Sequence, residues 1–208
     1  MTVATANRVG TAPLRPPLVV IGASAGGPAA LAALLKGLPP AFPAAIVIVQ
    51  HVDKRFTEGM AQWLTGQSSL PVRLAREGDR PEVGTALLAA GDGHLVMRVD
   101  GRLGYVCEPR DHAFRPSVDV FFHSVCEQWP GSVVGVLLTG MGADGASGLK
   151  ALRLKGRHTI AQDQATSAVY GMPKAAAIAG AAVDILPLNR IADRLTAVFR
   201  ETTKGGPP

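Results

Sequence analysis

Residues 18–37 read LVVIGASAGGPAALAALLKG, and this stretch decides the fold. The apolar, β-branched run at its start is typical of a buried strand. A small glycine-rich turn follows, and then an alanine- and leucine-rich segment with Pro28 near its beginning and Gly37 at its end. Those two residues are helix start and stop signals. The stretch therefore predicts a strand, a sharp turn and a helix, the opening unit of an α/β protein.

The same alternation of apolar runs and helical patterns continues along the chain. Further strands are expected at 45–49, 132–138, 158–161 and 184–187, and helices at 56–64, 117–129, after the loop 139–144, at 173–180 and at 189–201. A strand followed by a helix, repeated in this way, predicts a parallel sheet covered on both faces. We expect a doubly wound α/β fold with a mostly parallel sheet.

Residues 72–106 differ from this pattern, because short apolar runs are separated there by turn signals. Asp100-Gly101 lies between two such runs, and an Asp-Gly pair in that position is a strong hairpin signal. We expect this region to form a short antiparallel insertion or an antiparallel edge of the main sheet.

Length and composition predict one domain. The chain has 208 residues, 47% of them apolar, which is enough for one sizeable core. We place that domain at residues 17–202, between polar, proline-bearing tails at 1–16 and 203–208. The sequence shows neither a signal peptide nor a long uninterrupted apolar run, which predicts a cytoplasmic protein without membrane insertion.

Charge and cysteine content limit the partners and cofactors. The net charge of +5 favours acidic partners, but aromatic residues are sparse and no basic run is interleaved with them, which argues against nucleic acid. Cys107 and Cys126 form no CxxC motif and predict reduced thiols. The histidines outside the second strand show no metal-ligand spacing, so we expect no metal and no cofactor. For Asp92, Asp111, Asp119 and Asp163 a helix-cap or solvent role is favoured.

Ser24 is a candidate nucleophile. Gly22-Ala-Ser-Ala-Gly26 fits G-x-S-x-G, in which small neighbours let the serine project from a sharp strand-to-helix turn. The helix N-terminus behind the turn offers free N–H groups to a developing oxyanion. The alternative is a phosphate-binding loop of a nucleotide-binding module. It is the weaker match, because Ser24 occupies the second glycine position of G-x-G-x-x-G and no acidic residue ends the next strand.

His51 and Asp144 are the candidate partners of Ser24. His51 ends the second strand, and Asp144 follows the apolar strand at 132–138 in a glycine-rich loop. The carboxyl ends of parallel strands open on one edge of a sheet, so the three side chains are expected to meet there. They would act as nucleophile, base and orienting carboxylate. The alternative for Asp144 alone is a plain N-cap of the following helix.

The chain resembles the catalytic domain of the CheB methylesterase family. The matching motifs are Ile21-Gly-Ala-Ser-Ala-Gly-Gly27, Val49-Gln-His51, Arg115-Pro-Ser-Val-Asp119, Leu138-Thr-Gly-Met-Gly-Ala-Asp-Gly-Ala146, Ala161-Gln-Asp163 and Tyr170-Gly-Met-Pro-Lys174. The resemblance covers about residues 18–195. It implies a triad of Ser24, His51 and Asp144, with the Met141 N–H as an oxyanion donor.

Three further residues are weaker candidates. The Ala25 N–H is a second candidate oxyanion donor, and Ala25 stands where the family often has threonine. Arg115 is a candidate substrate contact, with a surface salt bridge as the equal alternative. Met172 belongs to a segment that lies beside the active site in the family, although Met172-Pro173 is also a plausible helix start.

The resemblance implies hydrolysis of glutamate methyl esters on the acidic cytoplasmic helices of methyl-accepting chemoreceptors, and in some members deamidation of receptor glutamine. Family members commonly carry an N-terminal receiver domain. About 17 residues precede the first strand here, so we expect a catalytic domain alone, which a separate receiver protein could regulate. A catalytically silent scaffold of the same fold is the alternative function.

Overall fold

The computed structural model describes residues 15–204, and the tails expected at 1–16 and 203–208 lie almost wholly outside that range. The elements in chain order are β1 (Leu18–Ala23), α1 (Gly27–Lys36), β2 (Ala45–Gln50), α2 (Lys54–Gln67), β3 (Val72–Leu74), β4 (Ala86–Leu88), β5 (His94–Met97), β6 (Leu103–Val106), α3 (Val118–Gln128), β7 (Val133–Leu137), α4 (Ala146–Leu154), β8 (His158–Gln162), α5 (Met172–Ile178), β9 (Asp184–Leu186) and α6 (Leu188–Lys204).

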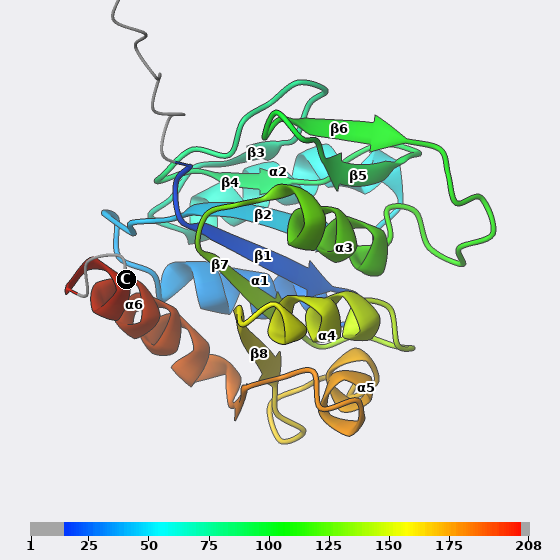
Figure 1. Ribbon diagram of the computed structural model, residues 1–208. Coiled ribbons are helices and arrows are strands. Elements are labelled where there is room, and N and C mark those ends of the chain that lie inside the picture. Colours follow the sequence, from blue (N-terminus) through cyan, green and yellow to red (C-terminus); the bar gives the residue numbers. More distant parts are fainter. Residues whose placement is uncertain (1–14, 205–208) are drawn as a thin grey trace, which may run out of the picture.

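Seven strands form one parallel sheet in the order β3-β4-β2-β1-β7-β8-β9. Figure 1 shows helices on both faces of this sheet. Alternate residues of the central strands contribute to two cores. One core joins the sheet to α1, α2 and α6, and the other joins it to α3, α4, α5 and the hairpin of β5 and β6. The doubly wound α/β fold is therefore confirmed.

The region 72–106 departs in part from expectation. The antiparallel hairpin is present as β5 and β6, with Asp100-Gly101 in its turn. The strands β3 and β4, however, extend the main sheet in the parallel sense, which corrects the expectation of an antiparallel edge. Each has only three residues, too few to show a periodicity. The direction of β4 is set by pairing with β2, which is distant in sequence, and β3 in turn pairs with β4.

The chain reverses its direction of winding at β1. The strands β2, β4 and β3 lie on one side of β1, and β7, β8 and β9 lie on the other. In open α/β sheets, ligands bind at the carboxyl ends of the strands beside such a switch point. The loops after β1, β2 and β7 meet at that edge, and they carry Ser24, His51 and Asp144. None of the helices within residues 15–204 has the length and apolar character that a bilayer crossing requires.

Candidate active site

Ser24 is held in a turn whose backbone is bonded on both sides. Its N–H donates to the Thr139 carbonyl at 3.0 Å, and its carbonyl accepts the Gly27 N–H at 2.7 Å and Gln50 Nε2 at 2.9 Å. Gly26, the N-cap of α1, has a φ of 76°, a left-handed conformation that favours glycine and lets the chain turn into the helix. The Ser24 hydroxyl makes no hydrogen bond within the described residues.

His51 follows β2 directly and is fixed by its neighbours. Its N–H donates to the Ala23 carbonyl at 3.0 Å, and its carbonyl accepts a second hydrogen bond from Gln50 Nε2 at 2.9 Å. The imidazole is only 6% exposed, and Phe114 stacks on it with 4.2 Å between ring centroids and 8° between ring planes. The backbone and the stacked ring together set the orientation of the imidazole.

Asp144 accepts a hydrogen bond from His51 Nε2 at 2.8 Å. The same carboxylate accepts the N–H groups of Val118 and Asp119 at the start of α3, at 2.7 and 2.9 Å, and the Ser117 hydroxyl at 2.8 Å. Burial alone would raise the pKa of Asp144, but the bond from His51 and those from the helix start lower this pKa to about 2. The carboxylate is therefore ionised at neutral pH, and His51 Nε2 must carry the proton.

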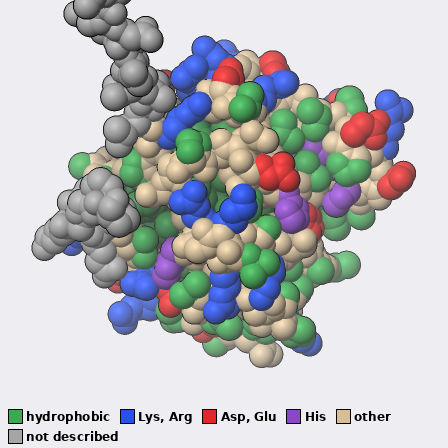
Figure 2. Space-filling view, in the orientation of Figure 1, with side chains coloured by type: hydrophobic (Ala, Val, Ile, Leu, Met, Phe, Trp, Pro, Cys, Tyr) green, Lys and Arg blue, Asp and Glu red, His purple; other side chains and the backbone are tan. Residues whose placement is uncertain are grey.

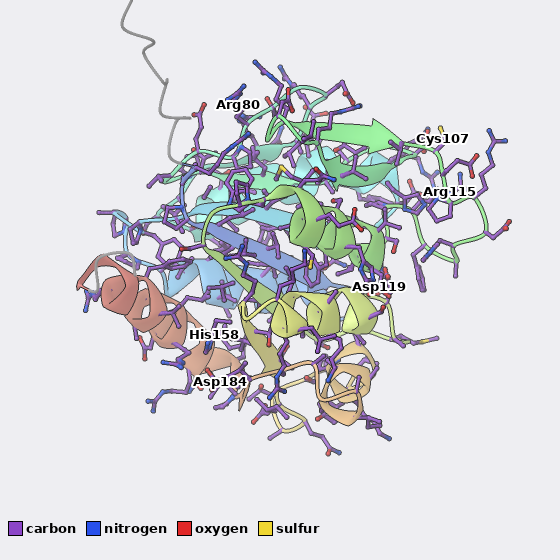
Figure 3. The ribbon with its side chains drawn as sticks, in the orientation of Figure 1. Arg80, Cys107, Arg115, Asp119, His158 and Asp184 are labelled. Atoms are coloured by element: carbon purple, nitrogen blue, oxygen red, sulfur yellow. The ribbon has the colours of Figure 1, made fainter. Side chains whose placement is uncertain are left out.

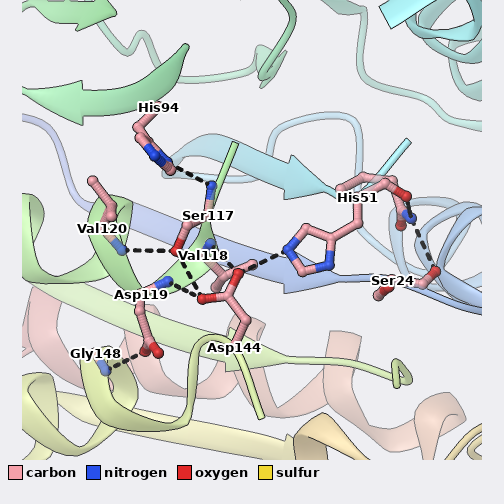
Figure 4. Close-up of polar contacts among 10 residues, drawn as sticks. Ser24, His51, His94, Ser117, Val118, Asp119, Val120, Asp144 and Gly148 are labelled. Atoms are coloured by element: carbon pink, nitrogen blue, oxygen red, sulfur yellow. Dashed lines mark hydrogen bonds and ion pairs between the residues drawn. The ribbon is translucent and has the colours of Figure 1, made fainter. Parts of the chain in front are cut away.

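The second nitrogen of His51 is free to act as a base. Nδ1 is buried and has no hydrogen-bond partner within the described residues. Figure 4 shows the imidazole between the other two side chains, with Nε2 toward Asp144 and the other nitrogen on the side of Ser24. With the proton on Nε2, the Nδ1 lone pair is available to the serine hydroxyl.

Asp144 does not serve as the N-cap of α4, which was the alternative role for this residue. The N-cap of α4 is Gly145, with no side-chain cap. Asp144 instead caps α3, and Asp119 of α3 accepts the Gly148 N–H of α4 at 2.7 Å. Each helix start is thus capped by an aspartate from the neighbouring segment. Burial raises the pKa of Asp119, and the nearby Asp144 charge acts in the same direction. This confirms a helix-cap role for Asp119.

Replacement of Asp119 by alanine should lower the free energy of unfolding by about 1–2 kcal/mol, because the α4 N–H loses its acceptor. Urea unfolding at pH 7 measures this. Asp119→Asn is the matched control, since its Oδ1 can accept the same bond, and it should stay close to wild type. Equal losses in the two variants would show that the cap contributes nothing.

Two backbone N–H groups beside Ser24 are available to an oxyanion. Those of Met141 and Ala25 make no hydrogen bond within residues 15–204. Both residues are exposed, so a substrate can reach them. The turn before Met141 is firmly held, since the Gly140 carbonyl accepts the N–H groups of Gly171 and Met172 at 3.0 and 2.8 Å. Both N–H groups are thus unoccupied within the described part of the chain, and their role as oxyanion donors stays a prediction.

Gly140 packs directly against Ser24, the candidate nucleophile. A Cβ at this position would lie 2.8 Å from the Ser24 Cβ and would also collide with the Met172 sulfur. We expect Gly140→Ala to displace Ser24 and to lower kcat by about tenfold to a hundredfold, measured as ester hydrolysis. Gly59→Ala, whose Cβ meets nothing within 4 Å, is the control and should leave kcat unchanged. A Gly140→Ala protein with wild-type kcat would contradict this assignment.

The structure places Arg115 and Met172, the two candidate substrate contacts, in different surroundings. Arg115 lies in the loop between β6 and α3 (Figure 3), where its guanidinium donates to the Arg110 carbonyl at 2.8 Å. A substrate contact by Arg115 stays a prediction. Met172 begins α5 and is fully buried against Gly140. The substrate contact expected of Met172 is thus replaced by a packing role, and the helix-start alternative is confirmed.

A second histidine–aspartate contact lies elsewhere. His158 Nε2 is 2.7 Å from Asp184 Oδ2, which also accepts Arg194 Nε at 2.7 Å. His158 and Asp184 are the first residues of β8 and β9, away from the carboxyl edge that carries Ser24 (Figure 3). No group of three or more His, Cys, Asp or Glu side chains within the described chain is arranged to hold a metal. Both cysteines are free thiols, as expected.

Three residues that support the site were not predicted from the sequence as functional residues. They are Gln50, which ties the Ser24 turn to β2, Phe114, which stacks on His51, and Ser117, which was expected only as the first residue of the helix at 117–129. A glutamine that ends an otherwise apolar buried strand was the available signal for Gln50. Nothing in the sequence pattern signals that Phe114 reaches His51.

The fold and the site define a class: a doubly wound α/β protein that brings a serine, and a histidine bonded to an aspartate, to one edge of its sheet, the three residue types that serine hydrolases use. Their chain order, serine, histidine, aspartate, differs from that of the α/β-hydrolases. Residues 19–195 match the family model for the CheB methylesterase. The chain belongs to that family.

Individual relatives and a solved structure point to the same family. The chain is 68% identical over 184 residues to protein-glutamate methylesterase/protein-glutamine glutaminase 1 of Burkholderia lata, covering 88% of this chain and 55% of the relative. The protein of the same name from Bordetella avium is 64% identical over 182 residues, with 88% and 53% covered. The chain spans about half the length of these curated relatives. The crystal structure of the Thermotoga maritima CheB methylesterase catalytic domain superposes with a TM-score of 0.84 at 34% identity, covering 89% of this chain and all of that one.

Proposed function

We propose that this chain is a serine esterase that hydrolyses glutamate methyl esters on chemoreceptors. The observation that carries the proposal is the imidazole of His51, bonded through Nε2 to a buried, ionised Asp144 and presenting a free Nδ1 to the side of Ser24. The names of the relatives supply the substrate class, a glutamyl methyl ester or a glutamine side chain.

The reaction proceeds in two stages. Ser24 Oγ attacks the ester carbonyl carbon while His51 Nδ1 takes the hydroxyl proton. The N–H groups of Met141 and Ala25 donate to the oxyanion of the tetrahedral intermediate. The bond to the methoxy group then breaks, the proton on Nδ1 passes to the departing oxygen, and methanol leaves an acyl-enzyme. Water attacks the acyl-enzyme with the same base, which yields the glutamate side chain and restores Ser24. This chemistry needs no cofactor.

Asp144 and Phe114 assist without forming bonds to the substrate. The Asp144 carboxylate stabilises the imidazolium that forms when Nδ1 takes a proton, and it holds the tautomer needed at the start. Phe114 covers one face of the ring and keeps water from it. Deamidation of a glutamine follows the same route, with ammonia as the leaving group in place of methanol.

The substrate is an acidic helical segment of a chemoreceptor, met in the cytoplasm. The chain carries a net charge of +5, and Figure 2 shows Lys and Arg side chains spread across the face that carries α3 and α4, with acidic side chains among them. Dispersed positive charge of this kind attracts an acidic helix without fixing one register. A separate receiver protein is the proposed regulator.

Methanol release from a methylated receptor fragment tests the proposal, together with labelling by a fluorophosphonate, which reacts quickly only with an activated serine. We expect both with the purified chain. A catalytically silent scaffold would bind the receptor but give neither signal. A nucleotide-binding module would instead be stabilised against heat by a dinucleotide, which we do not expect here.

A further inference from the structure

A second histidine is connected to the catalytic carboxylate through the start of α3. His94 is the first residue of β5 and is fully buried. Its Nδ1 accepts the Ser117 N–H at 3.1 Å, and the Ser117 hydroxyl donates to Asp144 at 2.8 Å. Figure 4 shows these residues as one continuous series that ends at His51. The hairpin thus reaches the triad through a single serine.

The protonation of His94 follows from its partners. Nδ1 faces a backbone N–H and must be an acceptor, so the proton lies on Nε2, which donates to the Pro109 carbonyl at 2.9 Å. Burial lowers the pKa of His94, which keeps the ring neutral. The charged and titratable groups around it are His112, whose ring lies 5.7 Å away, Arg115 and Asp144. Both ring nitrogens are therefore used, each in one fixed role.

The two bonds of His94 lead to different parts of the site. The bond to Ser117 leads to Asp144, which orients the His51 tautomer. The bond to Pro109 leads to the loop that carries Phe114, whose ring stacks on His51. The first residue of β5 thereby connects the hairpin to both supports of the catalytic imidazole.

We propose that His94 is a positioning residue for the esterase reaction, acting through Ser117 on the Asp144–His51 pair. This inference rests on the proposed function. A misplaced Ser117 moves the hydroxyl and the start of α3 away from Asp144, and the carboxylate can then no longer fix the His51 proton on Nε2. The substrate itself does not touch His94, so kcat should respond while KM does not.

Two substitutions separate the bonds of His94. In His94→Asn, Oδ1 takes the place of Nδ1 and can accept the Ser117 N–H, while the bond to Pro109 is lost. In His94→Gln, Nε2 takes the place of the histidine Nε2 and can donate to Pro109, while the bond to Ser117 is lost. Each variant removes one hydrogen bond, so each is the control for a purely structural effect of the other.

We expect His94→Gln to lower kcat for methanol release by about tenfold or more at unchanged KM. His94→Asn should rescue kcat to within about twofold of wild type. In the NMR spectrum, the low-field proton on His51 Nε2 should persist in His94→Asn and weaken or shift in His94→Gln. Wild-type kcat in His94→Gln, or equal losses in both variants, would overturn the inference.

Two possible failures of this experiment, an inactive wild type and an unfolded variant, still leave the proposal testable. If wild type releases no methanol, the proposed function fails, and the His51 proton signal still decides the positioning role. If His94→Gln does not fold, Ser117→Ala removes the other end of the same connection. Ser117→Ala must then lower kcat while His94→Asn does not. A Ser117→Ala protein with wild-type kcat overturns the inference.

Discussion

Replacement of Ser24 by alanine is expected to lower kcat for methyl ester hydrolysis by about 10⁵-fold to 10⁶-fold, the cost of removing the nucleophile from a serine hydrolase. The acyl-enzyme cannot form without Oγ, and the remaining groups can only polarise the carbonyl and bind the substrate. Methanol release from a methylated receptor fragment measures the loss. Fluorophosphonate labelling should disappear with it.

The structure predicts that this loss occurs without unfolding. Ser24 holds its turn through its backbone, and its hydroxyl makes no hydrogen bond within the described residues. The free energy of unfolding should therefore stay within about 0.5 kcal/mol of wild type. Ser132→Ala is a matched control, because Ser132 precedes β7 at the opposite edge of the sheet and also uses its carbonyl in an inter-strand bond. Methanol release by Ser24→Ala at the wild-type rate would exclude Ser24 as nucleophile.

The candidate triad could be predicted because its position depends on topology. Ser24, His51 and Asp144 follow β1, β2 and β7, which are long apolar strands adjacent in the sheet. Their strand signal is strong, and parallel pairing brings their carboxyl ends to one edge. No knowledge of individual side-chain contacts was required to expect these three residues together.

The supports of the triad could not be predicted in the same way. Ser117 begins the helix expected at 117–129 and is the N-cap of α3, but an N-cap pattern describes only its own helix and says nothing of a carboxylate from another loop. The role of Asp144 as a cap of α3 depends on how α3 and α4 pack. Phe114 reaches His51 through a loop whose path has no periodicity. These contacts are set by tertiary packing, which a local sequence pattern does not encode.

Replacement of Asp144 by asparagine is expected to lower kcat by about 10⁴-fold, as for the equivalent carboxylate of other serine hydrolases. An amide NH₂ group facing His51 would favour the proton on Nδ1, the nitrogen that must accept the serine proton. Hydrolysis of the methyl ester at pH 7 measures the effect. Asp163→Asn serves as control, because Asp163 caps a turn with Thr166 and lies outside the triad. A loss below about tenfold would show that Asp144 does not orient the base.

The same substitution should change how stability depends on pH. The pKa of Asp144 is lowered from 3.8 to about 2 in the folded protein, so the carboxylate stabilises the fold above pH 4 and this contribution is lost as the pH falls through 2. The shift corresponds to about 2 kcal/mol. The difference in unfolding free energy between wild type and Asp144→Asn should therefore be largest at pH 7 and shrink by about that amount toward pH 2. Urea unfolding across this range measures it. A difference independent of pH would mean that the hydrogen bonds from His51 and from α3 do not favour the ionised carboxylate, and the assigned proton on His51 Nε2 would lose its support.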